Sequence, residues 1–288
     1  MSQVVVAATA ASGVACEQCE GVCCTLDRLR KFHAAEALVR PLKGNAMKKS
    51  TRMLDHAMIV LAVVLGVGSV ALFAAMGSLS FAQKGWPESR ILAWDAALSF
   101  VFFLQHSGMV RRRFRARLAT VIAPRHQGAV YAIASGVVLT LVVVLWQRSE
   151  THLVVAEGAP LWIARGCAVL AVAIFVRSAF VLGSLFDPLG LVPIKAHLRG
   201  TSDRPSTFVV KGPYRWVRHP LYSCILVLFW SNPDLTADRL LFNVLWTAWI
   251  CVATVLEEAD LVADFGDAYR DYRRKVPMLI PWRGRVAV

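Results

Sequence analysis

Long apolar stretches constrain this chain more than any other feature of its sequence. The chain is 57% hydrophobic and only 18% charged over 288 residues. Its apolar residues gather in six stretches, at residues 57–82, 91–110, 128–146, 161–186, 221–230 and 240–256. About 20 apolar residues in a helix cross a bilayer core of roughly 30 Å, and the shortest stretch reaches that length if its helix begins near Tyr214. The sequence therefore predicts an all-α polytopic membrane helix bundle with about six transmembrane segments.

Basic residues are concentrated on one side of this predicted bundle. Of the 32 lysines and arginines, 26 fall on the side of the chain start, four fall on the opposite side, and two lie inside a stretch. Connections rich in Lys and Arg stay in the cytoplasm. We therefore expect an integral protein of a bacterial inner membrane with both termini in the cytoplasm. The net charge of +13 then reflects topology, with membrane lipids rather than nucleic acid as the partner of these cations.

The last two apolar stretches are expected to form a helical hairpin. Ser231-Asn232-Pro233-Asp234, between them, is typical of a turn. Pro220 suits the first position of a helix, where its missing N–H costs nothing. A hairpin returns both arms to the cytoplasmic face. At a rise of about 1.5 Å per residue the two arms differ in length by about two turns, so their ends are near neighbours rather than level. The sequence therefore predicts that His219 lies near the carboxylate pair Glu257-Glu258.

Residues 1–50 are expected to form a separate cytoplasmic tail. Four cysteines in it, Cys16, Cys19, Cys23 and Cys24, have a CxxCxxxCC spacing typical of a thiolate metal site or a redox pair. No second group of Cys or His completes a site, so a reduced tail without a catalytic role is the alternative, and no metal ligand is predicted. The leucines and cations that follow indicate a basic amphipathic helix on the membrane surface, or a solvated helix.

An ordered set of motifs runs through the last part of the chain. It consists of Gly212-Pro213-Tyr214-Arg215, Arg218-His219-Pro220-Leu221-Tyr222, Glu257-Glu258, Phe265-Gly266-Asp267-Ala268-Tyr269-Arg270-Asp271-Tyr272 and Val276-Pro277-Met278-Leu279-Ile280-Pro281. This set resembles the integral-membrane methyltransferases that include isoprenylcysteine carboxyl methyltransferase and the phospholipid methyltransferases. Gln105-His106-Ser107, Phe186-Asp187 and Phe229-Trp230 extend the similarity toward bacterial methanethiol S-methyltransferases, from about residue 91 to residue 281.

The resemblance implies S-adenosyl-L-methionine as the cofactor, bound without a Rossmann fold at the cytoplasmic end of the hairpin. By resemblance, the cofactor-binding residues are Val210, Gly212, Tyr214, His219, Pro220, Tyr222 and Glu257. These residue types suit the ligand, because tyrosine rings attract a sulfonium cation and a carboxylate accepts hydrogen bonds from ribose hydroxyls. The chain then divides into the tail, N-terminal transmembrane helices over residues 51–200, and a segment 201–288 with the cofactor-binding hairpin and the C-terminal methyltransferase motifs.

The methyl acceptor is expected to be a small thiol or a lipid-like molecule that enters from the membrane. A thiol with a pKa near about 8.5 is only a few per cent ionised at pH 7, so a base or a cation beside it would help. Arg218, His219 and Glu258 are the catalytic candidates for this role. Ionisable residues inside membrane segments usually mark a functional pathway, so His106 and Arg177 are the substrate candidates.

Each candidate also has a structural alternative. Basic residues such as Arg218 commonly anchor a helix to lipid headgroups, and Glu258 with its neighbour would serve equally to end a helix. His106 has Asp95 as a potential partner within the same stretch, and Arg177 has the default of charge pairing within the bundle.

Three departures from the family pattern leave the acceptor open. Cys224 replaces a usual glycine, Ser184-Leu185 replaces Asn-His before Phe186, and Ala259 replaces an arginine. We therefore predict an S-adenosylmethionine-dependent membrane methyltransferase with a small, methanethiol-like thiol as the favoured acceptor. The alternatives are a prenylcysteine carboxyl group or a phospholipid amine as acceptor, or a non-catalytic membrane sensor or accessory protein with a metal- or redox-responsive Cys tail.

Overall fold

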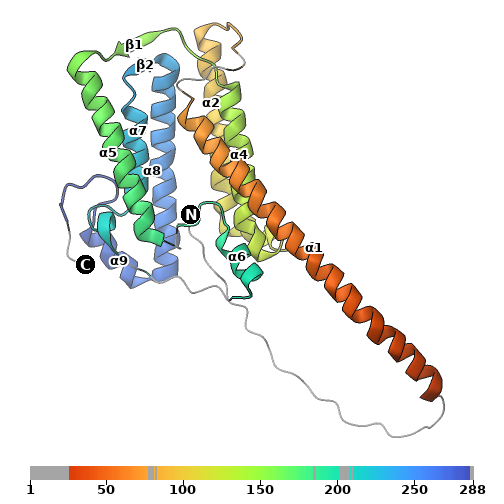
Figure 1. Cartoon of the computed structure of the whole chain (residues 1–288). Coiled ribbons are helices and arrows are strands. Elements are labelled where there is room, and N and C mark those ends of the chain that lie inside the picture. Colours follow the sequence, from red (N-terminus) through yellow and green to blue (C-terminus); the bar gives the residue numbers. More distant parts are fainter. Residues whose placement is uncertain are drawn as a thin grey trace.

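The computed structural model describes residues 26–76, 81, 83–183, 186–201, 208 and 210–285, with side chains from Ser50 onward. The elements are α1 (Leu26–Ala74), α2 (Glu88–Val110), α3 (Arg112–Leu118), α4 (Pro124–Leu145), β1 (His152–Val155), α5 (Gly158–Leu182), α6 (Val192–Arg199), η2 (Gly212–Arg215), α7 (Pro220–Trp230), β2 (Asp234–Thr236), α8 (Ala237–Phe265) and α9 (Asp267–Lys275) (Figure 1). The four N-terminal cysteines and the pair Ser184-Leu185 lie outside the described residues.

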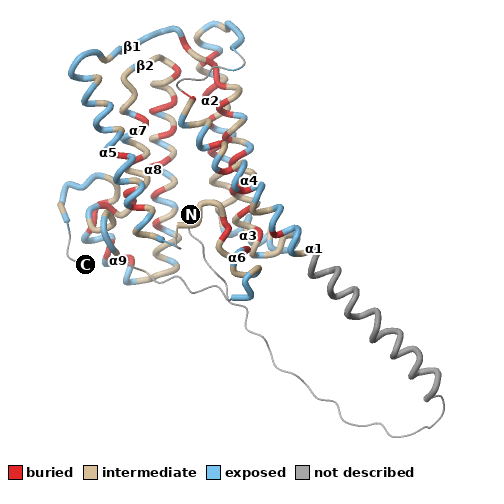
Figure 2. The backbone as a smooth tube through the Cα atoms, in the orientation of Figure 1, coloured by how far each residue is buried: buried red, intermediate tan, exposed pale blue. Residues whose placement is uncertain are grey.

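Within the described residues, four helices are long and apolar enough to cross a membrane: residues Ser50–Ala74 of α1, and α4, α5 and α8. α2 also has 23 residues but carries Asp95 and His106, which make it more polar. On α5 only Ala171 and Ser178 are buried, so most of its apolar side chains face outward, where lipid would cover them (Figure 2). The chain is therefore an all-α polytopic integral membrane protein, as predicted.

The first helix extends across the expected boundary at residue 50. α1 runs through this position without a break and ends at Ala74, before the predicted end of the first stretch at residue 82. The physical reason lies in the sequence, because no proline or glycine occurs between Gly44 and Gly66. Charged and apolar residues can both continue a helix, so the change from charged to apolar side chains does not end α1.

The predicted hairpin of α7 and α8 is confirmed, with different lengths for its arms. α7 begins at Pro220, as the proline predicted, and has 11 residues. The extension of this helix back to Tyr214 is wrong, because Gly212–Arg215 forms the separate 3-10 turn η2. α8 continues past Glu258 to Phe265, so the carboxylate pair lies inside a helix rather than at its end.

The helices form two groups that meet at an aromatic junction (Figure 1). α1 packs along α4 with α2 beside it, while α5 packs against α7, and α2 also contacts α8. Phe102 of α2 stacks on Trp246 of α8 with ring centroids 5.1 Å apart, and Phe103 stacks on Trp249 at 4.8 Å. Such ring pairs contribute about 0.5–1.5 kcal/mol beyond the apolar area they bury. The junction therefore fixes α8 against α2, on the sheet side of the site described next.

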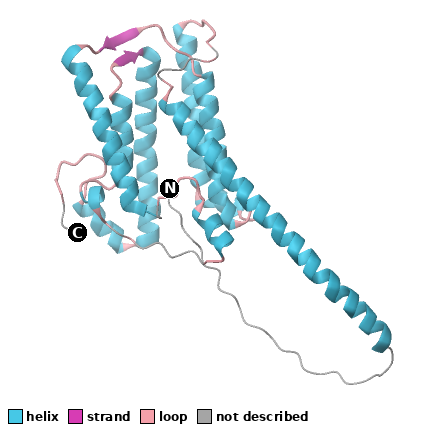
Figure 3. Cartoon of the chain, in the orientation of Figure 1, coloured by secondary structure: helices cyan, strands magenta, loops and turns pink. Residues whose placement is uncertain are grey.

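A two-stranded antiparallel sheet closes the end of the bundle opposite α9 (Figures 1 and 3). β1 pairs with β2, with His152 opposite Thr236 and Val155 opposite Asp234. β1 belongs to the connection from α4 to α5, and β2 belongs to the connection from α7 to α8. The predicted turn before α8 is thus partly a strand that ties two helix connections together.

Gly136 brings α4 into backbone contact with α1. A Cβ atom added at Gly136 would lie 2.5 Å from the carbonyl oxygen of Leu65 and 2.7 Å from its carbonyl carbon. Small residues allow this close approach of membrane helices. Gly136→Ala is expected to lower the free energy of unfolding by about 1–3 kcal/mol, because overpacking displaces backbone. Thermal unfolding in detergent measures the loss.

Gly68→Ala on α1 is the matched control, since nothing lies within 4 Å of the Cβ atom that it adds. Equal shifts of the unfolding midpoint in the two variants would show that the helix contact does not depend on Gly136.

Candidate active site

The start of α7 is held by the C-terminal segment of the chain. The backbone N–H of Arg218 donates to the carbonyl of Pro277 at 2.8 Å, and that of His219 donates to the carbonyl of Met278 at 3.1 Å. The hydroxyl of Ser223 adds a hydrogen bond to the carbonyl of Leu279 at 2.7 Å. Two motifs that are far apart in the sequence therefore form one unit at the end of the hairpin.

Arg218 and His219 both reach the buried carboxylate of Glu258 on α8. Arg218 Nε lies 2.5 Å and His219 Nε2 lies 3.2 Å from Glu258 Oε1, while Arg273 Nε of α9 lies 3.2 Å from Oε2. Arg218 also donates to the backbone carbonyls of Arg273 and Val276. Glu258 is only 3% exposed, and a buried carboxylate depends on such partners. This cation–carboxylate cluster joins α7, α8 and α9.

Glu257 points away from its neighbour, because successive residues on a helix are about 100° apart. The hydroxyl of Tyr222 donates to Glu257 Oε2 at 2.8 Å. The Tyr222 ring stacks on the imidazole of His219, with ring centres 5.6 Å apart and planes 11° apart. The Tyr222–Glu257 pair is therefore held in place by the cluster behind it.

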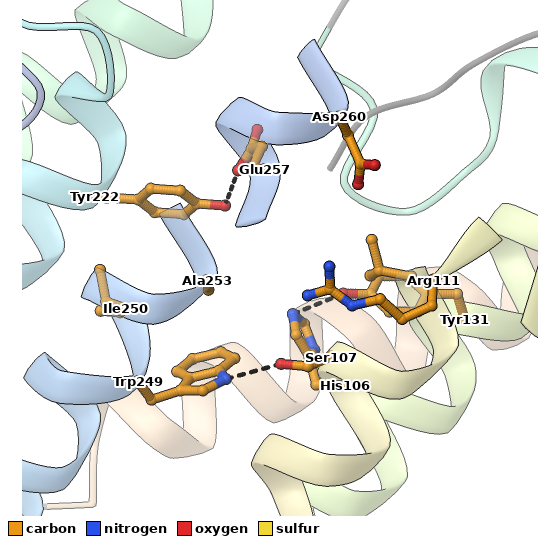
Figure 4. Close-up of a pocket in the computed structure, with 11 residues that line it drawn as sticks. His106, Ser107, Arg111, Tyr131, Tyr222, Trp249, Ile250, Ala253, Glu257 and Asp260 are labelled. Atoms are coloured by element: carbon orange, nitrogen blue, oxygen red, sulfur yellow. Dashed lines mark hydrogen bonds between the residues drawn. The ribbon is translucent and has the colours of Figure 1, made fainter. Parts of the chain in front are cut away.

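A pocket opens between the two helix groups on the Glu257 side of α8 (Figure 4). Its lining residues are His106, Ser107, Val110, Arg111, Tyr131, Tyr222, Trp249, Ile250, Ala253, Glu257 and Asp260. Tyr222 and Glu257 stand on one side of it, and His106 and Tyr131 stand across from them (Figure 4). The pocket encloses about 590 Å³ of empty space, part of which is open to the outside.

The wall from α2 and α4 carries a chain of hydrogen bonds. His106 Nε2 lies 2.6 Å from the hydroxyl of Tyr131, and His106 Nδ1 lies 3.2 Å from Ser135 Oγ. Asp95, the alternative partner considered for His106, instead accepts a hydrogen bond from the backbone N–H of Gln147 at 3.0 Å. His106 is therefore oriented by α4 and faces the pocket.

Tyr214 joins the same region from η2. Its backbone carbonyl accepts a hydrogen bond of 2.6 Å from the hydroxyl of Tyr272, which ties η2 to α9. Burial, together with the nearby Glu257 carboxylate and the Cys224 thiol, raises the pKa of Tyr214 above its usual value. The phenol therefore stays protonated at neutral pH and is available as a hydrogen-bond donor. The predicted residues that meet around the start of α7 are Tyr214, Arg218, His219, Pro220, Tyr222, Glu257 and Glu258.

Three other predicted site residues, Val210, Gly212 and Arg177, do not line the pocket. Gly212 has a φ of 54°, and a Cβ atom there would lie 3.0 Å from the side chain of Val181 on α5, so this glycine lets η2 approach α5. Val210 packs against the buried tyrosines of α9. Arg177 is exposed on α5 and does not line the pocket.

Tyr131 and Trp249 line the pocket although sequence patterns alone do not single them out. Trp249 precedes Glu257 by two helical turns, so both residues lie on one face of α8, and this spacing is a usable signal. Its indole N–H donates to Ser107 Oγ at 2.9 Å. Tyr131 lies in an apolar stretch on another helix, and only the packing of α2 against α4 brings it to His106.

The fold and the pocket define an integral membrane protein with a pocket of apolar and ionisable side chains between two helix groups. Residues 96–261, which include both walls of the pocket, match the family described as NnrU protein. No solved structure matches the chain.

Named relatives describe this family further. The chain is 36% identical over 210 residues to the methanethiol S-methyltransferase of a Pseudomonas species, covering 69% of this chain and 76% of the relative. It is 34% identical over 207 residues to the methanethiol S-methyltransferase of Mycobacterium tuberculosis, with 69% and 82% covered. It is 28% identical over 181 residues to nurim of Mus musculus, with 59% and 68% covered. The chain therefore belongs to this family of membrane methyltransferases, which confirms the predicted resemblance.

Proposed function

We propose that this chain transfers a methyl group from S-adenosyl-L-methionine to a small thiol such as methanethiol. The observation that carries the proposal is one pocket that joins the Tyr222–Glu257 pair to the His106–Tyr131 pair. Its two walls offer separate places for a methyl donor and an acceptor. The methanethiol S-methyltransferases among the relatives support this choice of acceptor.

The hairpin wall fits the chemistry of the donor, which has a sulfonium cation, ribose hydroxyls, an ammonium group and a carboxylate. Glu257 and Asp260 offer carboxylate oxygens to hydroxyl and ammonium groups, and the rings of Tyr214 and Tyr222 suit a cation. Arg111 at the pocket offers a charged partner for the donor's carboxylate. When bound, the donor supplies an electrophilic methyl group.

The Arg218–His219–Glu258 cluster has a positioning role in this proposal. None of its three residues lines the pocket, and all three are bonded to one another or to the C-terminal segment. The cluster holds the start of α7 against α8, so that Tyr222 meets Glu257. Holding reactants in an attack geometry can contribute roughly 7–11 kcal/mol to catalysis. Arg218, His219 and Glu258 would therefore affect catalysis by holding the Tyr222–Glu257 pair in place.

The space between the two walls suits a small apolar acceptor. Val110, Trp249, Ile250 and Ala253 line it with apolar groups. A short alkyl thiol gains from such contacts, whereas a phospholipid amine also needs room and charged partners for its phosphate. In this proposal the charged residues of the pocket, Arg111 among them, contact the donor and are not free to bind a phosphate. This arrangement favours the thiol.

We infer that both termini lie in the cytoplasm and that the pocket opens at the inner face of the membrane. The basic helices α3 and α9 lie at the end of the bundle opposite the sheet (Figures 1 and 2), and the basic side of a membrane protein faces the cytoplasm. In this arrangement residues 51–200 supply the acceptor wall and residues 201–288 supply most of the donor wall. A reporter that works only in the cytoplasm is expected to be active when fused to the C-terminus, and a reporter that works only outside the cytoplasm is expected to be inactive there.

Methyl transfer from labelled S-adenosyl-L-methionine by the detergent-solubilised full chain tests the proposal. The acceptors are methanethiol, ethanethiol, a prenylcysteine and phosphatidylethanolamine, and we expect label in the two volatile thioethers. Transfer only to the prenylcysteine or the phospholipid would overturn the thiol assignment. Absence of both transfer and donor binding would overturn the activity itself.

A further inference from the structure

The proposed reaction leaves one question that the geometry addresses: which group takes the proton of the thiol. A thiol with a pKa near about 8.5 is mostly protonated at neutral pH, and the thiolate is the better nucleophile. Glu258 is paired with Arg218 and with His219, and neither Glu258 nor His219 lines the pocket. Glu257 lines it but already accepts a hydrogen bond from the Tyr222 hydroxyl on the donor wall.

The acceptor wall has a hydroxyl and a base in direct contact. The Tyr131 hydroxyl faces the pocket and lies 2.6 Å from His106 Nε2 (Figure 4). Behind it, His106 Nδ1 lies 3.2 Å from Ser135 Oγ, and Gln105 Nε2 donates to the same oxygen at 3.3 Å. The result is a hydrogen-bonded chain that leads from the pocket into the packing between α2 and α4.

We assign His106 the tautomer in which Nε2 is free to accept. A serine oxygen has two lone pairs, so Ser135 Oγ can accept from Gln105 and also from an Nδ1–H of His106. With the proton on Nδ1, Nε2 carries the lone pair that faces the Tyr131 hydroxyl. The second partner of an imidazole commonly fixes its tautomer in this way.

We propose that Tyr131 and His106 form the proton-accepting pair for the thiol, an inference that rests on the proposed function above. The thiol proton passes to the oxygen of Tyr131 as the Tyr131 proton passes to His106 Nε2. The thiol sulfur forms a bond to the methyl carbon as the bond between that carbon and the donor's sulfonium sulfur breaks, with the electron pair staying on the donor sulfur. The products are a neutral thioether and the demethylated donor, and His106 releases its extra proton to water after turnover.

Two thiols of similar shape and different acidity separate proton transfer from positioning. Ethanethiol needs a base at pH 8, whereas 2,2,2-trifluoroethanethiol is much more acidic and is largely thiolate there. We expect His106→Gln and Tyr131→Phe each to lower kcat for ethanethiol by about 100-fold, the lower range for general-base catalysis. For trifluoroethanethiol the loss is expected to stay below about tenfold, because the substrate arrives without its proton. Calorimetry with S-adenosylhomocysteine is expected to give an unchanged Kd.

Trp249→Phe is the control, since it removes the hydrogen bond to Ser107 and leaves the His106–Tyr131 pair in place. Any loss that it causes is expected to be equal for the two thiols. Equal losses for both thiols in His106→Gln and Tyr131→Phe, with the donor still bound, would overturn the proton-accepting role and leave the proposed function intact. A wild-type chain that methylates neither thiol overturns the proposed function and this inference with it.

Discussion

Replacing Arg218 with methionine is expected to remove about 3–5 kcal/mol from the free energy of unfolding and to abolish measurable binding of the methyl donor. The carboxylate of Glu258 is 3% exposed and would lose its closest cation, which lies 2.5 Å away. Its remaining partners are His219 and Arg273, and the Arg273 side chain is 46% exposed to solvent. A buried carboxylate that keeps only these partners destabilises the fold.

Donor binding would fail for a second reason. Arg218 also donates to the backbone carbonyls of Arg273 and Val276, so its loss removes the side-chain hydrogen bonds that tie the end of α9 to the start of α7 and leaves only the backbone and Ser223 contacts there. The stacked pair of His219 and Tyr222 then loses its support. Chemical unfolding in detergent measures the stability, and calorimetry with S-adenosylhomocysteine measures the binding.

Arg270→Met is the matched control for Arg218→Met. Arg270 pairs with Asp267 on the exposed face of α9, and an exposed ion pair contributes about 0–1 kcal/mol. A second variant, Arg218→Met with Glu258→Leu, removes both buried charges and is expected to regain stability without regaining donor binding. A single variant as stable as the control, or a double variant that binds the donor normally, would contradict the positioning role of the cluster.

The hairpin is the part of the site that local sequence signals predict well. Pro220 marks the start of α7, the apolar runs give the directions of the two helices, and a turn-forming segment joins them. Together these signals require His219 to approach Glu258, and the two side chains do lie 3.2 Å apart. Such contacts are predictable because they depend on a single connection in the chain.

The acceptor wall is the part that the sequence predicts poorly. Tyr131 reaches His106 only because α4 packs against α2 with one particular rotation, and no turn or cap signal encodes that rotation. Glu257 and Glu258 have different roles because helix periodicity makes their side chains face about 100° apart. Which of the two faces the pocket follows from the aromatic contacts of α8 with α2, such as Phe103 on Trp249.

Replacing Glu257 with glutamine is expected to weaken donor binding by about 10- to 100-fold, because hydrogen bonds to a charged group contribute about 1.5–3 kcal/mol. The change keeps the shape of the side chain and leaves an oxygen for the Tyr222 hydroxyl, so the pocket is expected to stay folded. Asp264→Asn is the matched control on the same helix, because Asp264 pairs with Arg112 and does not line the pocket. Calorimetry is expected to show an unchanged Kd for that variant, and equal losses in both variants would remove Glu257 from the donor site.

The comparison of two ligands shows which part of the donor Glu257 contacts. S-adenosylmethionine and S-adenosylhomocysteine share their ribose and amino acid groups, and only the first has a positive sulfur. If the Glu257 carboxylate accepts hydrogen bonds from the ribose hydroxyls or the ammonium group, both ligands lose affinity by the same factor in Glu257→Gln. If it lies beside the sulfonium, S-adenosylmethionine loses more, because only this ligand loses a charge–charge attraction. We expect equal factors, because the rings of Tyr214 and Tyr222 suffice to face the cation and because a carboxylate beside the sulfur would stabilise the bound donor more than the neutralising transition state.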